Sequence, residues 1–146
     1  MRIYTTAFEN NKIIPKKFTC DGENVSPEIF IENVPSQARS LVLIVEDPDS
    51  PGGDWSHWVV WNIDPTTKFI KENSIPEGAT SGLNDFKNPG YGGPCPFKGE
   101  HRYFFKIFAI SKILSLSSIS QKADVEKEIA GCALEESEFI GRYSRV

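Results

Sequence analysis

The order of hydrophobic and polar positions along the chain predicts three core strands. Ser40–Glu46 carries the continuous apolar run Leu-Val-Leu-Ile-Val, which is typical of a strand covered on both faces. Val59–Ile63 is a second run of β-branched and aromatic residues. Arg102–Ile110 alternates between two apolar faces and is the third. We expect the first two to be antiparallel neighbours joined by a long loop.

Weaker patterns predict short edge strands and one helix. The expected edge strands are Arg2–Phe8, Ile29–Ile31, Phe69–Ile75 and Phe139–Tyr143. Apolar residues spaced i, i+4 and i+7 favour a helix over Gln121–Cys132, with Ser120 as its N-cap. Many short strands, frequent Gly and Pro, and one late helix indicate a single domain over residues 1–146. Its expected class is mainly β, a β-sandwich with a small helical appendage.

Two irregular segments flank the predicted core strands. The loop that follows Asp47 joins two antiparallel strands, so Asp47 and His57 should lie at the same sheet edge. If the third strand runs antiparallel to the first, His101 and Arg102 lie at that edge too. Gly78–Gly99 is rich in Gly and Pro, and loops of this length inside a compact domain are more often functional than filler.

Composition narrows the classes of partner and compartment. The net charge of −4 argues against a nucleic-acid surface, which needs a basic stripe. No apolar run approaches the roughly 18 residues of a spanning helix, so membrane insertion is not expected. The first residues show no signal peptide, and the expected location is cytoplasmic. The cysteines Cys20, Cys95 and Cys132 are widely spaced, and we expect all three to be reduced thiols.

Both histidines of the chain fall at predicted strand starts beside irregular loops. The residues expected around His57 and His101 are Asp47, Asp49, Trp55, Tyr91, Arg102 and Tyr103. Imidazoles change charge near neutral pH, arginine adds a forked cation, and glycine-rich backbone brings N–H groups close to a ligand. This set predicts a site for a small anion such as phosphate or a carboxylate.

Other interpretations of the same residues remain open. A histidine at a strand start is often structural, and Arg102 could pair with a structural carboxylate. A metal site from Asp47 and the two histidines has suitable ligand types but no close ligand spacing. Cys95 with His101 matches a cysteine hydrolase only in residue type. A triad of Ser56, His57 and Asp47 fails because adjacent strand residues point to opposite faces.

The sequence resembles the phosphatidylethanolamine-binding protein family, in particular its prokaryotic branch of Raf kinase inhibitor-like proteins. One signature is Asp47-Pro48-Asp49-Ser50-Pro51 followed by Trp55-Ser56-His57-Trp58. The second is Gly90-Tyr91-Gly92-Gly93-Pro94-Cys95-Pro96, then Gly99-Glu100-His101-Arg102-Tyr103. The opening segment 18–27 and the closing Gly141-Arg142-Tyr143 also match, so the resemblance covers nearly the whole chain.

The resemblance implies two antiparallel sheets, a helix near the C-terminus and a small pocket for phosphate-type head groups. The residues implied to line the pocket are Asp47, Pro51, Trp55, His57, Gly93, Pro94, His101 and Tyr103, with Tyr91 at its mouth. Asp49 and Arg102 would brace the walls through a salt bridge. The resemblance also allows a cis bond at Ser50-Pro51, because a tight turn would place that proline against the pocket.

Two departures concern the rim of the implied pocket. Phe97 stands where prokaryotic relatives usually have a proline, and only Lys98-Gly99-Glu100 separates it from His101. The helix that partly covers the pocket in longer, animal-type members has no counterpart, so a more open pocket is expected.

Three classes of function follow from the residues and the resemblance together. The first is a non-enzymatic anion-binding protein with a regulatory role and no cofactor. The second is an inhibitor that contacts a serine protease or a kinase through its loops. The third is a small hydrolase. A homodimer is also expected, with Trp58, Trp61 and Phe104 as candidates for its apolar face.

Overall fold

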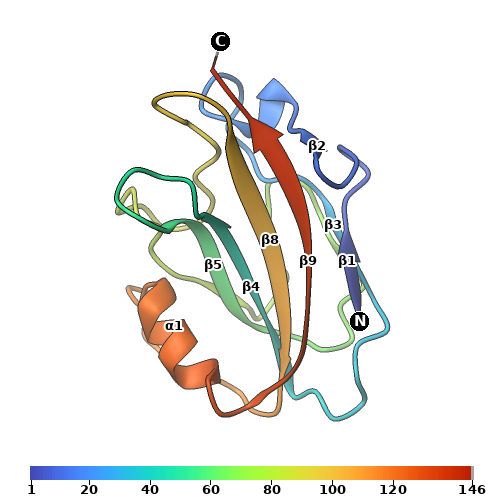
Figure 1. The fold of residues 1–146 in the computed structure, drawn as a ribbon. Coiled ribbons are helices and arrows are strands. Elements are labelled where there is room, and N and C mark those ends of the chain that lie inside the picture. Colours follow the sequence, from blue (N-terminus) through green and yellow to red (C-terminus); the bar gives the residue numbers. More distant parts are fainter. Residues whose placement is uncertain (146) are drawn as a thin grey trace.

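The computed structural model describes residues 1–145 and shows a β-sandwich with one α-helix (Figure 1). The smaller sheet has the order β1-β3-β6, with bounds Arg2–Tyr4, Ile29–Glu32 and Phe69–Ile70. The larger sheet has the order β2-β9-β8-β4-β5-β7, with bounds Lys12–Ile13, Ala133–Tyr143, His101–Ile110, Ser40–Asp47, Trp55–Ile63 and Thr80–Ser81. The helices are η1, a 3-10 turn at Lys16–Phe18, and α1 at Lys122–Ile129. The expected fold class is confirmed, and β2 is the one strand among residues 1–145 that pairs in parallel, with β9.

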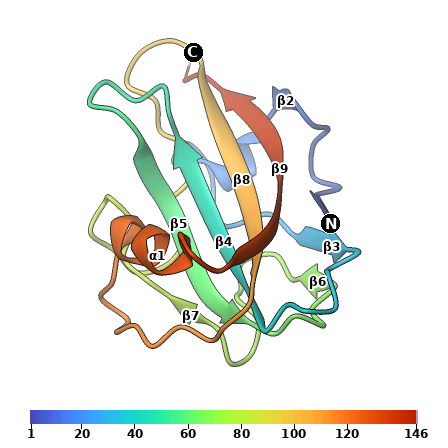
Figure 2. The same ribbon diagram turned by 60° about the horizontal axis from the view of Figure 1, so that its bottom comes forward.

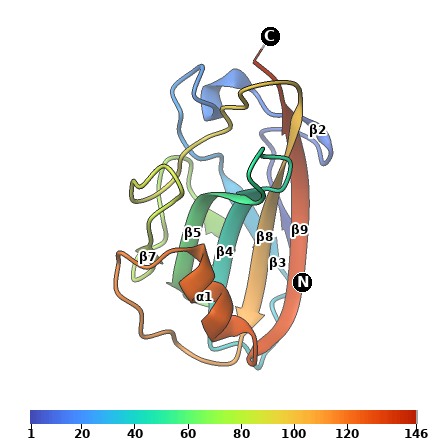
Figure 3. The ribbon, with the colours of Figure 1, turned by 60° about the vertical axis from the view of Figure 1, so that its left-hand side comes forward.

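Strand β4 is the centre of the larger sheet, and all eight of its residues are buried. Leu41 and Leu43 belong to the core between the two sheets, whereas Val42 and Ile44 belong to a second core beneath α1. Figures 2 and 3 show α1 over one face of the larger sheet and the smaller sheet on the other. The continuous apolar run therefore forms a strand covered on both sides, as predicted.

Trp58 and Trp61 of β5 lie on opposite faces of the larger sheet. Trp58 packs in the core between the sheets, and Trp61 packs beneath α1. Both are almost fully buried, at 2% and 0% exposure. The opposite orientation agrees with the two-residue period of a strand. The expectation that these tryptophans supply a dimer face is wrong, because neither reaches the surface.

Several element boundaries differ from the sequence-based expectation. Helix α1 begins one residue later, with Gln121 as its N-cap, and the N-cap and Asp124 form a reciprocal capping box. Strand β9 begins at Ala133 rather than Phe139, because its polar first half pairs along β8. The first half of β9, which includes Glu135 and Glu136, does not alternate between apolar and polar residues. It is a strand because its backbone pairs with β8, which the sequence pattern does not predict.

The register of the larger sheet brings three strand ends together. Asp47 pairs with Trp55 across β4 and β5, and the first residue of β8, His101, pairs with Tyr143 of β9. Glu46 pairs with Phe104, so the end of β4 lies beside the start of β8. The predicted convergence at one sheet edge is confirmed, and the loops that follow β4 and precede β8 both lie at this end of the sheet (Figure 1).

Candidate functional site

A cavity of about 170 Å³ opens at this end of the larger sheet. Its lining residues are Asp47, Ser50, Pro51, Trp55, His57, Phe86, Cys95, Pro96, Phe97, His101 and Tyr103. Four larger hollows, of about 250, 310, 520 and 710 Å³, lie elsewhere on residues 1–145, and none of them is lined by a histidine. The smaller cavity is therefore the candidate site, because the titratable and aromatic groups converge on it.

Six of the residues predicted to bind ligand line this cavity. They are Asp47, Pro51, Trp55, His57, His101 and Tyr103. The rings of His57 and His101 both lie beside the ring of Tyr103, at centroid distances of 5.2 and 6.4 Å. The structure thus brings both imidazoles and one carboxylate to a single hole, as the register predicted.

Three predicted residues do not line the cavity. The hydroxyl of Tyr91 donates a hydrogen bond to the carbonyl oxygen of Phe18 at 2.7 Å, and burial raises the pKa of this tyrosine. Gly93 N–H donates to Oδ1 of Asn24 at 2.8 Å, which turns this residue toward the segment after η1. Pro94 is buried beside it. These residues hold the loop in place and do not face the cavity.

Four residues that line the cavity were not predicted to do so, namely Ser50, Phe86, Cys95 and Pro96. Phe97 was expected at the rim of the pocket, and it also lines the cavity. The wall lies two positions further along the glycine-rich loop than the motif implied, because Gly92 and Gly93 are fixed to His57 and Asn24. Pro96 is the last residue of that motif and Phe97 follows it, but a loop has no periodicity that predicts which way its residues face.

His57 is buried within the cavity wall and hydrogen-bonded to the glycine-rich loop. Its Nδ1 lies 2.6 Å from the carbonyl oxygen of Gly92, and Gly92 N–H donates back to the His57 carbonyl at 2.9 Å. The rings of Phe86 and Tyr103 meet it edge-on. Burial lowers the pKa of His57, which favours a neutral ring.

His101 forms the second polar wall of the cavity. Its Nδ1 lies 2.7 Å from Oδ2 of Asp47, and both side chains are nearly buried. Its Nε2 lies 3.2 Å from the carbonyl oxygen of Lys98. Both ring nitrogens of His101 therefore lie against oxygen atoms of the protein.

Two hydrogen-bond donors of the cavity wall have no partner among residues 1–145. They are the hydroxyl of Tyr103 and the indole Nε1 of Trp55, and both atoms are buried. Burial raises the pKa of Tyr103, so the phenol keeps its proton. Buried polar atoms almost always find partners, and each exception calls for an explanation such as a ligand.

The pair Asp49 and Arg102 braces the outer rim of the site. Asp49 accepts two hydrogen bonds from the guanidinium and one from the Arg102 backbone N–H, each at 2.9 Å. These hydrogen bonds lower the pKa of Asp49 to about 2. Neither residue lines the cavity, so the supporting role implied for the pair agrees with its position.

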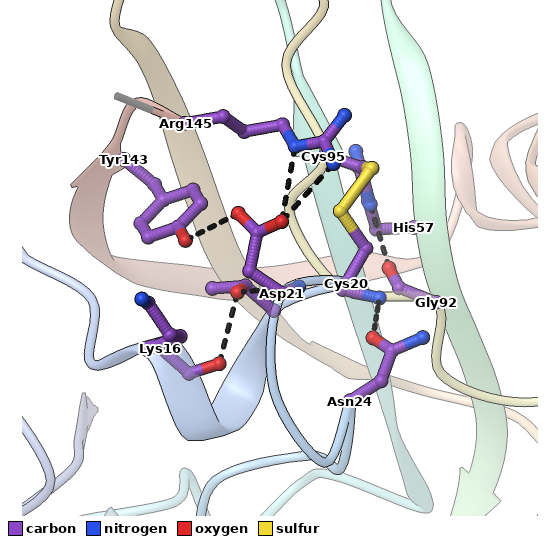
Figure 4. The surroundings of a disulfide bond; sticks show 11 residues. Lys16, Cys20, Asp21, Asn24, His57, Gly92, Cys95, Tyr143 and Arg145 are labelled. Carbon is purple, nitrogen blue, oxygen red and sulfur yellow. Dashed lines mark hydrogen bonds and ion pairs between the residues drawn. A yellow bond between two sulfur atoms is a disulfide. The ribbon is translucent and has the colours of Figure 1, made fainter.

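The expectation that all three cysteines are reduced is wrong for two of them. Cys20 and Cys95 form a disulfide that links the turn after η1 to the cavity wall (Figure 4). The sequence separation of 75 residues gave no local signal, because the pairing depends on how the two loops fold together. Cys132 is a half-buried free thiol.

Further expectations were tested by the backbone and by the arrangement of polar side chains. The structure has no cis peptide bond in residues 1–145, so the bond at Ser50-Pro51 is trans and that expectation is wrong. Within the described residues, no group of three His, Cys, Asp or Glu side chains is arranged to hold a metal. No helix among residues 1–145 is long and apolar enough to cross a bilayer.

Comparison with known proteins places this architecture in a family. The family model described as phosphatidylethanolamine-binding protein matches residues 4–144. A UPF0098 protein of Methanothermobacter thermautotrophicus is 43% identical over 150 residues, which cover 99% of each chain. One from Aquifex aeolicus is 44% identical over 99% of this chain and 89% of its own.

Two solved structures share the fold over almost the whole chain. One is a phosphatidylethanolamine-binding protein homolog from Chlamydia trachomatis, with a TM-score of 0.94, 35% identity and coverage of 99% and 97%. The other is YbcL of E. coli, described as a member of the mammalian family, with a TM-score of 0.93, 27% identity and coverage of 99% and 98%. This chain belongs to the phosphatidylethanolamine-binding protein family.

Proposed function

We propose that the cavity binds a small oxyanion, phosphate or a phosphorylated head group, and does not convert it chemically. The observation that carries the proposal is the pair of unpartnered buried donors, the Tyr103 hydroxyl and the Trp55 indole N–H. An oxyanion held between them would satisfy both, and the cavity of about 170 Å³ has room for it. Family membership supports the same class of ligand.

The charges around the cavity support weak rather than tight binding. Asp49 is paired with the Arg102 guanidinium outside the cavity, whereas the Asp47 carboxylate lines the cavity beside His101 and opposes a bound anion. The Arg102 guanidinium is already bound to Asp49. The ligand is therefore held mainly by neutral donors, and we expect affinities in the millimolar to micromolar range, about −4 to −8 kcal/mol.

Phosphate titration followed through the histidine ring protons by NMR tests the proposal. The chain has two histidines, and both line the cavity, so each signal reports on the site. Tyr103→Phe removes one of the unpartnered donors while keeping the ring, and we expect phosphate affinity to fall about five- to tenfold. Tyr91→Phe is the matched control outside the cavity. Ring signals that do not move at millimolar phosphate would contradict the proposal.

One structural feature favours a second function, contact with a protease or kinase. Phe97 is 92% exposed at the tip of the loop between the disulfide and β8. An aromatic side chain held out on a tethered loop is suited to enter a pocket on a partner protein. Assays of a serine protease panel with wild type and Phe97→Ala test this function. Inhibition that is lost in Phe97→Ala but kept in Tyr103→Phe, the variant that weakens phosphate binding, would support the second function over the first.

The hydrolase alternative has its own direct test. The triad that sequence reasoning considered is not assembled, because Ser56 and His57 are adjacent on β5 and point to opposite faces. Incubation with p-nitrophenyl phosphate should therefore give no turnover above background. Turnover that disappears in His57→Ala would show instead that the cavity is an active site.

A further inference from the structure

The hydrogen bond between His57 and Gly92 fixes which nitrogen of the ring carries the proton. Nδ1 lies 2.6 Å from the carbonyl oxygen of Gly92, and a carbonyl oxygen can only accept. Nδ1 is therefore the donor (Figure 4). In a neutral imidazole the other nitrogen, Nε2, then carries a lone pair and accepts.

The surroundings of the ring keep it neutral. Burial opposes a charge on His57, and the aromatic rings of Phe86 and Tyr103 pack against it in T-shaped pairs. The charged or titratable groups near it are Asp47, Asp85 and Tyr103. Asp47 is paired with His101, and Asp85 accepts a hydrogen bond from the backbone N–H of Ser56. These carboxylates are thus engaged elsewhere and do not supply an ion pair to His57.

The one hydrogen bond of the His57 ring with normal distance and angle within residues 1–145 is the one at Nδ1, although the Gly93 backbone also lies near the ring. The side chain lines the cavity, and we infer that Nε2 is open to a ligand there. A ligand in the cavity therefore meets an acceptor at His57 as well as the donors of Tyr103 and Trp55. An oxyanion without a proton would bring one of its lone pairs against the lone pair of Nε2. An oxyanion with a P–OH group would donate to it.

We propose that the cavity selects oxyanions that carry a proton, so that it binds phosphate in preference to sulfate. The inference rests on the proposed anion site and names its ligand more closely. It also separates free phosphate from phosphate bound as an ester. A phosphomonoester loses its last proton with a pKa near 6 and has no P–OH to offer above that pH.

Titration at pH 8 compares oxyanions that have the same charge and differ in whether they carry a proton. Inorganic phosphate is then mainly HPO₄²⁻, whereas sulfate and methyl phosphate are dianions of similar size without a proton. The intact protein is titrated with each, with the two histidine rings followed by NMR. We expect phosphate to bind at least about tenfold more tightly than sulfate, because a buried acceptor left unpaired is costly. Methyl phosphate should behave like sulfate.

A second measurement examines the tautomer without any ligand. Long-range ¹H–¹⁵N NMR correlations of the free protein should show His57 protonated at Nδ1 and unprotonated at Nε2. The variant His57→Phe removes the acceptor, so phosphate affinity should fall to that of sulfate, which should hardly change. Because this variant also strips the partner from the Gly92 carbonyl, its fold is checked by near-UV circular dichroism.

The outcomes separate this inference from the proposed function. Binding of phosphate, sulfate and methyl phosphate with affinities within about twofold would overturn the selectivity and leave the anion site standing. A proton on Nε2 of His57 would overturn the inference as well. No response to any of the three anions would overturn both.

Discussion

Oδ2 of Asp47 lies 2.7 Å from Nδ1 of His101, which joins the last residue of β4 to the first residue of β8. The two residues are 54 positions apart in the chain, and the antiparallel register of β4 and β8 places them together. Both side chains are nearly buried, with exposures of 5% and 9%. A buried pair of this kind orients the imidazole on the cavity wall.

The variant Asp47→Asn should destabilise the fold. The amide cannot replace a carboxylate as a charge-assisted acceptor, so we expect the free energy of unfolding to fall by about 1–3 kcal/mol. Urea denaturation measures the change. Asp54→Asn is the control, because its side chain is 54% exposed and lies 3.6 Å from Lys122 at the surface. That control should change stability by less than about 0.5 kcal/mol. Equal effects of the two variants would contradict a buried pair.

The ion pair at the rim should make stability depend on pH in the acid range. Arg102 lowers the pKa of Asp49 to about 2, below the value near 3.8 expected for the unfolded chain. As the pH falls through 4, the unfolded chain takes up a proton first, so the free energy of unfolding falls between about pH 4 and 2.

The variant Arg102→Gln isolates this contribution. Its stability should lie below that of wild type at pH 6, and the difference should shrink as the pH approaches 2. Urea unfolding at pH 6, 4, 3 and 2 gives the two curves. A difference that stays constant over this range would show that Arg102 acts through packing, for example against the Phe104 ring, and not through Asp49.

Gly93 should tolerate no side chain. A Cβ there would collide with the carbonyl oxygen of Phe18 and with the side-chain oxygen of Asn24, which accepts the Gly93 hydrogen bond. We expect Gly93→Ala to lower the free energy of unfolding by about 2 kcal/mol or more. Gly52→Ala is the matched control, because an added Cβ meets nothing within 4 Å. A Gly93→Ala variant with an unchanged free energy of unfolding would show that the loop can shift to make room for the added Cβ.

Removal of the disulfide should destabilise the chain and release the cavity wall. The double variant Cys20→Ser with Cys95→Ser opens a loop of 75 residues, and we expect a loss of about 2–4 kcal/mol. The single variant Cys132→Ser should have a much smaller effect, since this thiol is free. Thermal and urea unfolding of the three proteins make the comparison. A double variant as stable as wild type would contradict a closed disulfide.

The apolar pattern of the sequence was sufficient for the fold class and for the position of the core. Ser40–Glu46 was predicted as a strand with two buried faces because periodicity and burial are linked locally, and all of β4 is buried. The convergence of Asp47, His57 and His101 also followed from the sequence. Asp47 and His57 flank the loop between two antiparallel strands, so the sequence alone places them at one end of the sheet. The position of His101 followed only on the condition that its strand pairs antiparallel with β4, which the structure confirms.

The loops were decided only by the tertiary structure. Gly93 and Pro94 were assigned to the pocket from the motif, yet hydrogen bonds to the segment after η1 turn them away, and Cys95 and Pro96 take that place. Irregular backbone has no period, and its direction depends on partners far away in the chain. For the same reason, the disulfide between Cys20 and Cys95 could not be predicted from the sequence.

The sequence by itself therefore determined which chemical groups gather at the sheet edge, since strand ends follow from the alternation of apolar residues. The tertiary structure alone decided which atom of each group is free for a ligand. His57 shows the difference, because its residue type was known from the start. Which of its nitrogens accepts depends on the Gly92 carbonyl 35 positions away. A hydrogen bond between distant segments has no signature in either segment by itself.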